Sequence, residues 1–388
     1  MSQIPKDFTL LQVTPELETG GAEQTTLDVA AAVVRAGGRS LVASRGGRMA
    51  ARLQASGAQL IEMPVHSKNP LVMAQNARRL AALIRAEKVS LVHARSRAPA
   101  ISALWAARRA GAAFVTTYHG VYNAKSALKR WYNSVMTRGD LVIANSAYTH
   151  DQILEKYQID PDRLVTIPRG VELTRFHPAE VSAERVEALR QAWGVEADDG
   201  RVKFLLGGRL TRWKGQQLLI EAAGRLRAGG ERGFTVLLAG DDQGRGGYRE
   251  ELKGAIAAAG VRDNVRLVGH CDDMPAAYLL ADFACAPSLD PEPFGRTAVE
   301  PQLMGRPVLA ANHGAARETV LPGESGWLVT PGDPQAWARA METAIATSAE
   351  LRAEMGLAGQ ARSRRLYSVE AMCDATLEVY RRVLEARA

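Results

Sequence analysis

Residues 8–36 read FTLLQVTPELETGGAEQTTLDVAAAVVRA, and this stretch contains the unit from which the fold is predicted. An apolar run over residues 8–13 predicts a strand, a loop with Gly20 and Gly21 follows, and residues 22–36 have a helical pattern. A glycine pair between a strand and a helix allows close backbone approach to a ligand, and a helix N-terminus favours anions. A plain structural turn is an equally good interpretation of the pair at this point.

The same alternation of short apolar runs and longer helical patterns continues along the first half of the chain. Further helical stretches are predicted over residues 71–87, 99–110 and 147–157. The further strands are predicted over residues 40–43, 59–63, 91–93, 113–118, 140–144 and 164–167. Connections of this length hold crossover helices, so the pattern predicts a parallel sheet covered on both faces.

The pattern starts again after a stretch with three breakers, Pro168, Gly170 and Pro178. Six more strands are predicted over residues 202–206, 234–239, 265–268, 283–286, 308–310 and 327–329. We therefore predict an α/β protein with two Rossmann-like doubly wound domains, residues 1–172 and 173–367. A last helix within residues 368–388 is expected to pack back toward the first domain. Because ligands of open parallel sheets bind beyond the carboxyl ends of the strands, we expect functional residues just after strands, in a cleft that the two domains face.

The composition of the 388 residues is that of an ordinary globular protein, with 46% hydrophobic and 23% charged residues. No apolar run approaches the roughly 18 residues of a membrane span, and no signal-peptide pattern is present at the N-terminus. The three cysteines form no CxxC pair, so a reducing cytoplasmic location is expected.

The net charge of +7 is unevenly distributed. Residues 1–178 contain 23 Lys and Arg against 13 Asp and Glu, whereas residues 179–388 contain 26 against 29. A basic first half suggests an anionic partner, either a nucleic acid or a membrane surface. Since no helix-turn-helix, finger or RNP pattern is visible, a nucleic acid is not expected.

Two motifs follow predicted strands and carry side chains suited to an anionic ligand. TTYHG places His119 at the end of the fifth strand, where either a structural or a functional role is open. LLGGRLTRWKG places Gly208, Arg209 and Lys214 after the first strand of the second half. Such a pair of cations beside glycines suits a diphosphate, although solvated surface cations would look the same.

The most informative segment is residues 287–307, PSLDPEPFGRTAVEPQLMGRP, in which Glu292 and Glu300 lie eight residues apart. We predict a loop up to about residue 293 and a helix over residues 297–304. One carboxylate can accept sugar hydroxyls and the other ribose hydroxyls, while amides around residues 294–296 can hold a phosphate. A glycoside hydrolase would need its two carboxylates across one bond, not along one segment.

Other kinds of chemistry find little support in the sequence. G-x-G-x-x-G is absent from the first loop, and no Walker A, HExxH, EF-hand or G-x-S-x-G motif occurs. The only D-x-D, at residues 160–162, contains a proline and reads as a turn. We therefore expect no metal and no cofactor.

Taken together, these motifs closely resemble the retaining GT-B glycosyltransferases of family 4. GGAE, TTYHG, IPRGVELTRFHP, GGRLTRWKG and EPFGRTAVE occur in that family's order, and LVGHCDDMPAAYLLADFACAPS and ESGWLVTPGD flank the last motif. The likeness covers nearly the whole chain. One departure is Arg169, which stands where the family has an asparagine in the linker.

The resemblance implies transfer of a sugar from a UDP- or GDP-linked donor with retention at the anomeric carbon. The catalytic residues that it implies are His119, Arg209, Lys214 and Glu292. His119 would contact the transferred sugar, Glu292 would bind the donor-sugar hydroxyls and Glu300 the ribose. The residues implied to bind the donor are Gly20, Gly21, Gly208, Arg209, Lys214, Glu292, Phe294, Gly295, Arg296 and Glu300. Attack from the front side, with the donor phosphate accepting the acceptor's proton, is also implied.

The acceptor is not named by these motifs. The basic first half favours a lipid-linked or lipopolysaccharide-type acceptor of cell-envelope synthesis, with the enzyme peripheral on the inner face of the cytoplasmic membrane. A soluble small-molecule or sugar acceptor, and a nucleotide-sugar epimerase on the same fold, remain alternatives. A sugar-binding protein without catalytic activity would have no use for a diphosphate clamp.

A segment for membrane contact is predicted at residues 125–138, KSALKRWYNSVMTR. Its apolar residues recur as one helical stripe at residues 128, 131, 132, 135 and 136. Lys125, Lys129, Arg130 and Trp131 are the residues expected to contact anionic lipid. An ordinary amphipathic helix packed on its own domain is the competing interpretation.

Overall fold

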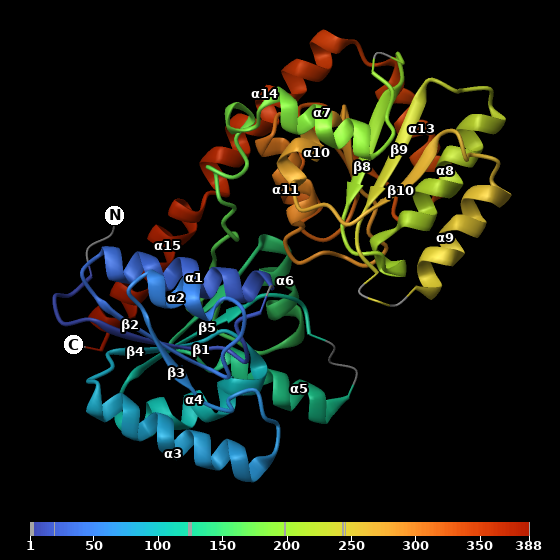
Figure 1. The fold of residues 1–388 in the computed structure, drawn as a ribbon. Coiled ribbons are helices and arrows are strands. Elements are labelled where there is room, and N and C mark those ends of the chain that lie inside the picture. The colour runs from blue at the N-terminus through green and yellow to red at the C-terminus, as the bar shows by residue number, and fades with distance from the viewer. Residues whose placement is uncertain are drawn as a thin grey trace. The chain divides into compact units, whose positions relative to one another are not determined.

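The structure is a computed structural model, and it describes residues 4–18, 20–122, 126–197, 199–242, 244 and 246–387. The chain divides into two compact units (Figure 1). One contains Met1–Gly170 and Val369–Ala388, and the other contains Val171–Ser368. The division lies two residues before the expected position because Val171 pairs with the second unit. Its amide donates to the carbonyl of Tyr367 at 2.7 Å.

The first unit is built on a seven-stranded sheet with the order β3-β2-β1-β4-β5-β6-β7, and all its strand pairs are parallel. The strands are β1 Thr9–Val13, β2 Arg39–Ser44, β3 Gln59–Glu62, β4 Leu91–Ala94, β5 Ala113–Tyr118, β6 Leu141–Ala144 and β7 Leu164–Thr166. Its helices are α1 Gly21–Arg35, α2 Ala50–Ala55, α3 Pro70–Ala86, α4 Arg97–Ala110, α5 Ala127–Asn133, α6 Ala147–Lys156 and α15 Val369–Glu385.

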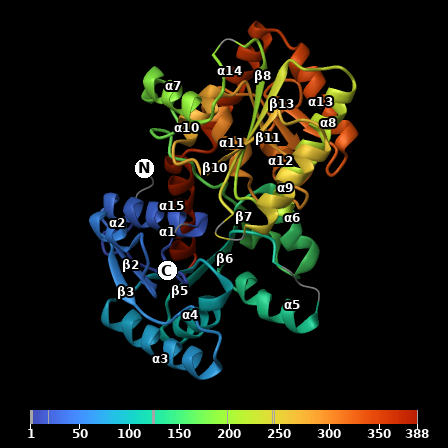
Figure 2. The same cartoon turned by 45° about the vertical axis from the view of Figure 1, so that its right-hand side comes forward.

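Both faces of this sheet are buried. Helices α1 and α15 cover one face, where Leu10, Val115 and Ile143 meet Val33 and Tyr380. Helices α3 and α4 cover the other face (Figures 1 and 2). The last helix of the chain therefore completes the core of the first unit.

The second unit has a six-stranded sheet with the order β10-β9-β8-β11-β12-β13, again with parallel pairs only. The strands are β8 Val202–Gly207, β9 Phe234–Ala239, β10 Val265–Gly269, β11 Phe283–Ala286, β12 Val308–Ala311 and β13 Gly326–Val329. Its helices are α7 Ala183–Ala192, α8 Gln216–Ala228, α9 Gly247–Ala258, α10 Met274–Leu280, α11 Arg296–Leu303, α12 Ala316–Thr319, α13 Pro334–Ala346 and α14 Ala349–Leu366.

Helices α8, α9 and α13 pack on one face of the second sheet, and α10 and α11 pack on the other. Two parallel sheets, each covered on both faces, are the Rossmann-like α/β architecture that the sequence predicts, so the fold prediction is confirmed. In such sheets all the carboxyl ends of the strands lie at one edge, and the loops that leave β8, β11 and β12 therefore meet.

Candidate active site

The predicted cation motif lies in the loop between β8 and α8, and its shape depends on one glycine. Gly215 has φ +79°, and a Cβ there would overlap the carbonyl of Pro287, which follows β11. This close approach of two backbones brings Lys214 to the loop that contains Glu292. The Lys214 Nζ lies 2.8 Å from the Glu292 Oε1, and the two side chains are only 12% and 16% exposed.

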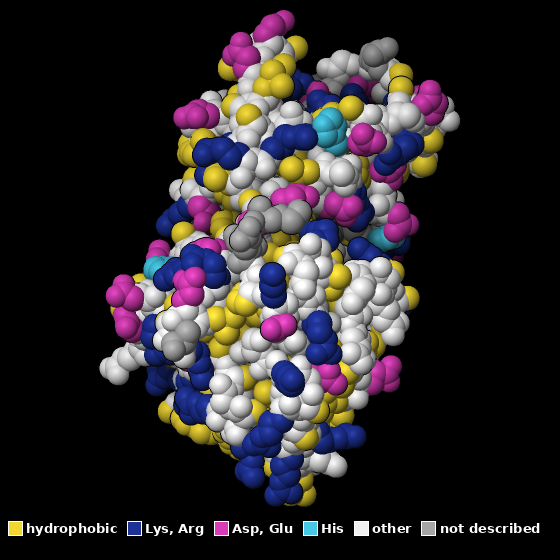
Figure 3. All heavy atoms as spheres, turned by 90° about the vertical axis from the view of Figure 1, so that its left-hand side faces the viewer, with side chains coloured by type: hydrophobic (Ala, Val, Ile, Leu, Met, Phe, Trp, Pro, Cys, Tyr) yellow, Lys and Arg dark blue, Asp and Glu magenta, His cyan; other side chains and the backbone are white. Residues whose placement is uncertain are grey.

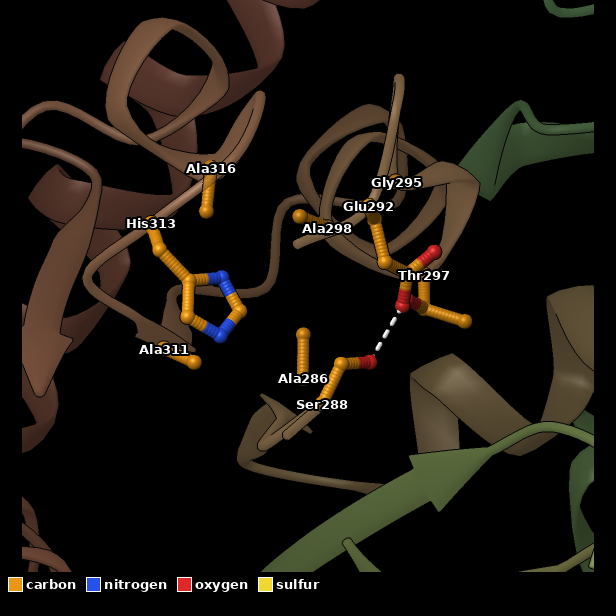
Figure 4. A pocket seen from close by; sticks show the side chains of 9 residues that line it. All are labelled: Ala286, Ser288, Glu292, Gly295, Thr297, Ala298, Ala311, His313 and Ala316. Atoms are coloured by element: carbon orange, nitrogen blue, oxygen red, sulfur yellow. Dashed lines mark hydrogen bonds between the residues drawn. The ribbon is translucent and has the colours of Figure 1, made fainter. Parts of the chain in front are cut away.

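Glu292 is fixed from two further sides. The Ser288 hydroxyl donates to the same Oε1 (Figure 4). The carbonyl of Glu292 accepts from the amide of Ala315, after β12. Gly314, with φ +57°, permits this contact, since a Cβ there would come within 2.7 Å of the Glu292 backbone. The carboxylate is thus held in place by residues that follow two neighbouring strands, β11 and β12.

Glu300 lies on α11, in the middle of the helix rather than in a loop. It is 8% exposed, and its Oε1 lies 2.6 Å from the Arg296 Nη2, one helical turn earlier. The hydroxyl of Tyr278 donates to its other oxygen at 3.3 Å. Burial, with Glu300 second, raises the pKa of Tyr278, which therefore stays protonated as a donor. Arg296, predicted only as a source of a backbone amide, also neutralises this carboxylate with its side chain.

The start of α11 offers backbone donors, as the glycine and phenylalanine in EPFGR imply. Gly295 is the N-cap residue with φ +75°, and no side chain caps the helix. The first amides of a helix have no partner within it, so they and the helix dipole favour an anion. The side chain of Phe294 is itself buried and packs edge-on against Tyr367, with ring centroids 5.6 Å apart.

Gly208 and Arg209 lie at the start of the same β8–α8 loop. The amide of Gly208 donates to the carbonyl of Ala239 at 2.8 Å, so this glycine continues the sheet pairing. The side chain of Arg209 is exposed and, within the part of the chain that the structure describes, has no ion-pair partner. It is therefore the available cation beside the Lys214–Glu292 pair.

Sequence reasoning missed Ser288 and His313, which line a small pocket with Glu292, Gly295 and Thr297 (Figure 4). Both ring nitrogens of His313 are buried, and neither has a hydrogen-bond partner among the described residues. His313 comes two residues after β12, as His119 follows β5 directly. The expectation that functional residues follow strands directly, which indicated His119, could therefore have found His313 as well.

In the first unit, the structure brings His119 and Arg169 together. The His119 Nδ1 lies 3.2 Å from the Arg169 Nη2. Burial, then Arg169 and Arg95, lowers the pKa of His119 well below its usual value, so the imidazole is neutral at pH 7. A Cβ on Gly21 would lie 2.5 Å from the Arg169 guanidinium, and a Cβ on Gly20 would overlap the side chain of Glu23. The glycine pair thus makes room for charged side chains at the start of α1.

The prediction that the apolar residues form one helical stripe is wrong, because the fold divides them between a helix and a following turn. Helix α5 ends at Asn133, and Val135 and Met136 in the following 3₁₀ turn are buried in the core. Leu128 and Trp131 remain 74% and 62% exposed. Lys129 and Arg130 are exposed beside them. Lys125 lies outside the described residues.

The described residues contain no group of three or more His, Cys, Asp and Glu side chains that could hold a metal ion. None of the described helices is long and apolar enough to cross a bilayer.

Comparison with known proteins agrees with the motifs. The chain matches the family models Glycosyltransferase Family 4 over residues 19–175 and Glycosyl transferases group 1 over residues 189–362. A glycosyltransferase from Rickettsia africae has 33% sequence identity and a TM-score of 0.90, and the match covers 98% of this chain and 100% of that one. The chain belongs to this glycosyltransferase family, as the resemblance of its motifs indicated.

Two further relatives concern ligands. The Anabaena protein HepE, solved in complex with UDP-glucose, has 25% identity and a TM-score of 0.80, with 96% of this chain and 98% of that one covered. A D-inositol 3-phosphate glycosyltransferase of Salinispora arenicola is 34% identical over 254 residues. That match covers 63% of this chain and 55% of the relative, so the chain spans little more than half the length of the curated relatives it matches.

Proposed function

We propose that the protein is a retaining hexosyltransferase that uses a nucleotide diphosphate sugar as donor. The observation that carries the proposal is the Lys214–Glu292 pair, held by Ser288 beside the open N-terminus of α11 and the exposed Arg209. This one set of strand-end loops supplies a carboxylate for sugar hydroxyls, and cations and amides for phosphate oxygens. The HepE complexes with UDP and UDP-glucose support a UDP-linked donor.

In this proposal Lys214 and Glu292 bind separate parts of the donor. Lys214 exchanges Glu292 for an oxygen of the diphosphate, and Glu292 then accepts hydroxyls of the sugar. Glu300, which forms an ion pair with Arg296, accepts the hydroxyls of the ribose. His119 contacts the transferred sugar through its neutral imidazole, and the turn at Gly20 and Gly21 approaches the diphosphate.

The reaction breaks the bond between the anomeric carbon and the diphosphate oxygen. Positive charge develops on the sugar and negative charge on the leaving group. Arg209, Lys214 and the amides of α11 stabilise that negative charge because they are already oriented before the reaction. The acceptor hydroxyl attacks from the side that the leaving group occupied. It passes its proton to the departing phosphate oxygen, so the sugar retains its configuration.

A binding panel of UDP- and GDP-sugars tests the donor. We expect one nucleotide series to raise the melting temperature, with the increase lost in Lys214→Ala. The variant Lys253→Ala is the matched control, because that lysine pairs with Glu250 on exposed α9. Equal stabilisation of wild type and Lys214→Ala would contradict the proposal. Formation of an epimeric donor without acceptor would instead indicate the epimerase.

We propose a lipid-linked or lipopolysaccharide-type acceptor, reached at the cytoplasmic surface of an anionic membrane. The exposed Leu128 and Trp131 beside Lys129 and Arg130 support this. Helices α3 and α4 add six arginines with no acidic residue, and Leu71 and Trp105 are exposed there. Lys and Arg side chains gather over this part of the first unit (Figure 3). Arginines with exposed aromatic and aliphatic side chains suit a headgroup boundary.

Sedimentation with phosphatidylglycerol and phosphatidylcholine vesicles tests this acceptor. We expect salt-sensitive binding to the anionic vesicles only, which is lost when Lys129 and Arg130 are changed to Glu. A phosphorylated polyol is the second candidate, because relatives of the chain are named D-inositol 3-phosphate glycosyltransferases. Absence of vesicle binding at low salt would favour this soluble acceptor.

A further inference from the structure

A small hollow at the carboxyl ends of β4, β5, β6 and β7, in the first unit, shares only His119 with the residues proposed to bind the donor. Arg95, His119, Asn145 and Arg169 supply its polar lining, and Met372 and Thr376 of α15 close one side. The enclosed space is about the size of one water molecule. It therefore admits one oxygen of a larger group whose remainder lies at the mouth.

Arg95 is the least expected member of this lining. It is only 2% exposed, and its hydrogen bonds go to neutral acceptors, the Gln12 Oε1 at 2.8 Å and the Thr117 Oγ1 at 3.4 Å. Within the described ranges, no carboxylate lies within ion-pair distance of it. A buried guanidinium without a counter-ion is costly, and burial indeed lowers the pKa of Arg95. An anion in the hollow would offset that cost.

The cluster beneath Arg95 holds it in this position. Because a guanidinium can only donate, the Thr117 oxygen accepts from Arg95 and its own hydrogen is free for the His93 Nε2, 2.7 Å away. The His93 Nδ1 then donates to the hydroxyl of Tyr380 at 2.6 Å. Burial, with Arg95 second, lowers the pKa of His93, in agreement with a neutral ring.

Two further polar groups in the hollow contain atoms without a hydrogen-bond partner in the described part of the chain. Asn145 is 2% exposed, and neither its amide nitrogen nor its oxygen has a hydrogen-bond partner among the described residues. The same holds for the buried Nε2 of His119, whose Nδ1 lies beside Arg169. Buried polar atoms nearly always have partners, so donors aimed at one small space indicate a missing ligand atom.

We propose that this hollow is an oxyanion site that takes one oxygen of a phosphate- or carboxylate-class group on the acceptor. The inference rests on the proposed function, because it assigns the charge of the acceptor. Arg95 and Arg169 supply positive charge, and the Asn145 amide nitrogen donates a hydrogen bond. A phosphorylated lipid-linked glycan and a soluble sugar phosphate share this chemistry. Vesicle binding, measured separately, distinguishes these two sources.

The test is equilibrium dialysis of the whole chain against radiolabelled inorganic phosphate at constant ionic strength, with UDP at saturation. UDP occupies the donor site, so the phosphate that remains bound reports the hollow. We expect about one phosphate per chain. In Asn145→Leu the affinity should fall at least tenfold, without a lower melting temperature, because the amide has no protein partner to lose.

Two other variants keep the experiment decisive. Asn76→Ala changes an equally buried asparagine of the same unit whose amide donates to the carbonyl of Pro64, and it should bind phosphate as wild type does. Arg95→Lys keeps the charge but loses the forked donor, and its affinity should fall at least threefold.

Three results would overturn the proposal. The first is no phosphate bound by wild type either with or without UDP, which would make the hollow a water site. The second is equal affinity in wild type and Asn145→Leu. The third is displacement of phosphate by UDP together with weaker UDP binding in Asn145→Leu, which would assign the hollow to the donor diphosphate. If the donor assignment itself is wrong, the wild type does not bind UDP. The phosphate affinity of the hollow is then measured by titrating phosphate into Lys214→Ala.

Discussion

At the strand ends of the second unit Lys214 is paired with Glu292 and Arg296 with Glu300. At the strand ends of the first unit, by contrast, the hydrogen-bond partners of Arg95 among the described residues are all neutral. The paired charges offset each other's burial within the protein, so a ligand there must exchange partners with groups already in place. The unpaired guanidinium has no such compensation, so a ligand there adds a missing partner. We therefore propose two kinds of anion-binding chemistry in the same fold, and only the first has a recognisable sequence motif.

Removal of Lys214 from its pair with Glu292 should have the largest effect, which is on sugar transfer. Lys214→Ala removes the cation proposed to bind the leaving diphosphate, which should cost about 2–4 kcal/mol of transition-state stabilisation, as for loss of one oxyanion donor. The measurement is kcat/KM for sugar transfer, with Lys253→Ala as the surface control. Unchanged turnover in both Lys214→Ala and Arg209→Ala would remove these residues from the site.

Weakening the support beneath Arg95 should affect folding more than donor binding. Tyr380→Phe leaves the buried His93 Nδ1 without a partner and should lower the free energy of unfolding by about 1–3 kcal/mol in urea. Tyr132→Phe is the control, because that hydroxyl is buried without a partner among the described residues. A loss of similar size in both variants would show that the His93–Tyr380 hydrogen bond is not the cause.

Acid should destabilise the first unit through His93 and His119. The pKa values of His93 and His119 are lowered in the folded state, so below about pH 6.5 the unfolded chain binds more protons than the folded one. Their contribution is fully present above that pH and is lost as the pH falls, by up to about 1.4 kcal/mol per pH unit for each histidine. Unfolding measured from pH 7.5 to 5.5 should show a smaller loss in His93→Gln. An equal slope in that variant would contradict the assignment.

The smallest expected effect is that of metal removal. Because side-chain cations and helix amides are available for the diphosphate, EDTA should leave sugar transfer unchanged. Activity lost in EDTA and restored by magnesium or manganese would show that the paired cations do not suffice.

The motifs in the sequence predict much of the proposed donor site because each motif is local. A strand that ends in glycines followed by Arg209 and Lys214, and the spacing between Glu292 and Glu300, predict residues at one sheet edge through the strand-end rule alone. The helix predicted over residues 297–304 is found as α11, Arg296–Leu303. The family and the two-sheet fold could be read in this way, and both are confirmed.

Other features depended on which strands become neighbours, and no local pattern carries that information. Arg95, Asn145 and Arg169 are far apart in sequence and meet only because β4, β5, β6 and β7 are adjacent in the sheet. His313 approaches Glu292 because β12 pairs with β11. The predicted apolar stripe is divided because Val135 and Met136, in the 3₁₀ turn after α5, are buried in the core. Periodicity determines which residues share a face of one element, but the packing of the whole unit decides which of them are buried and what they contact.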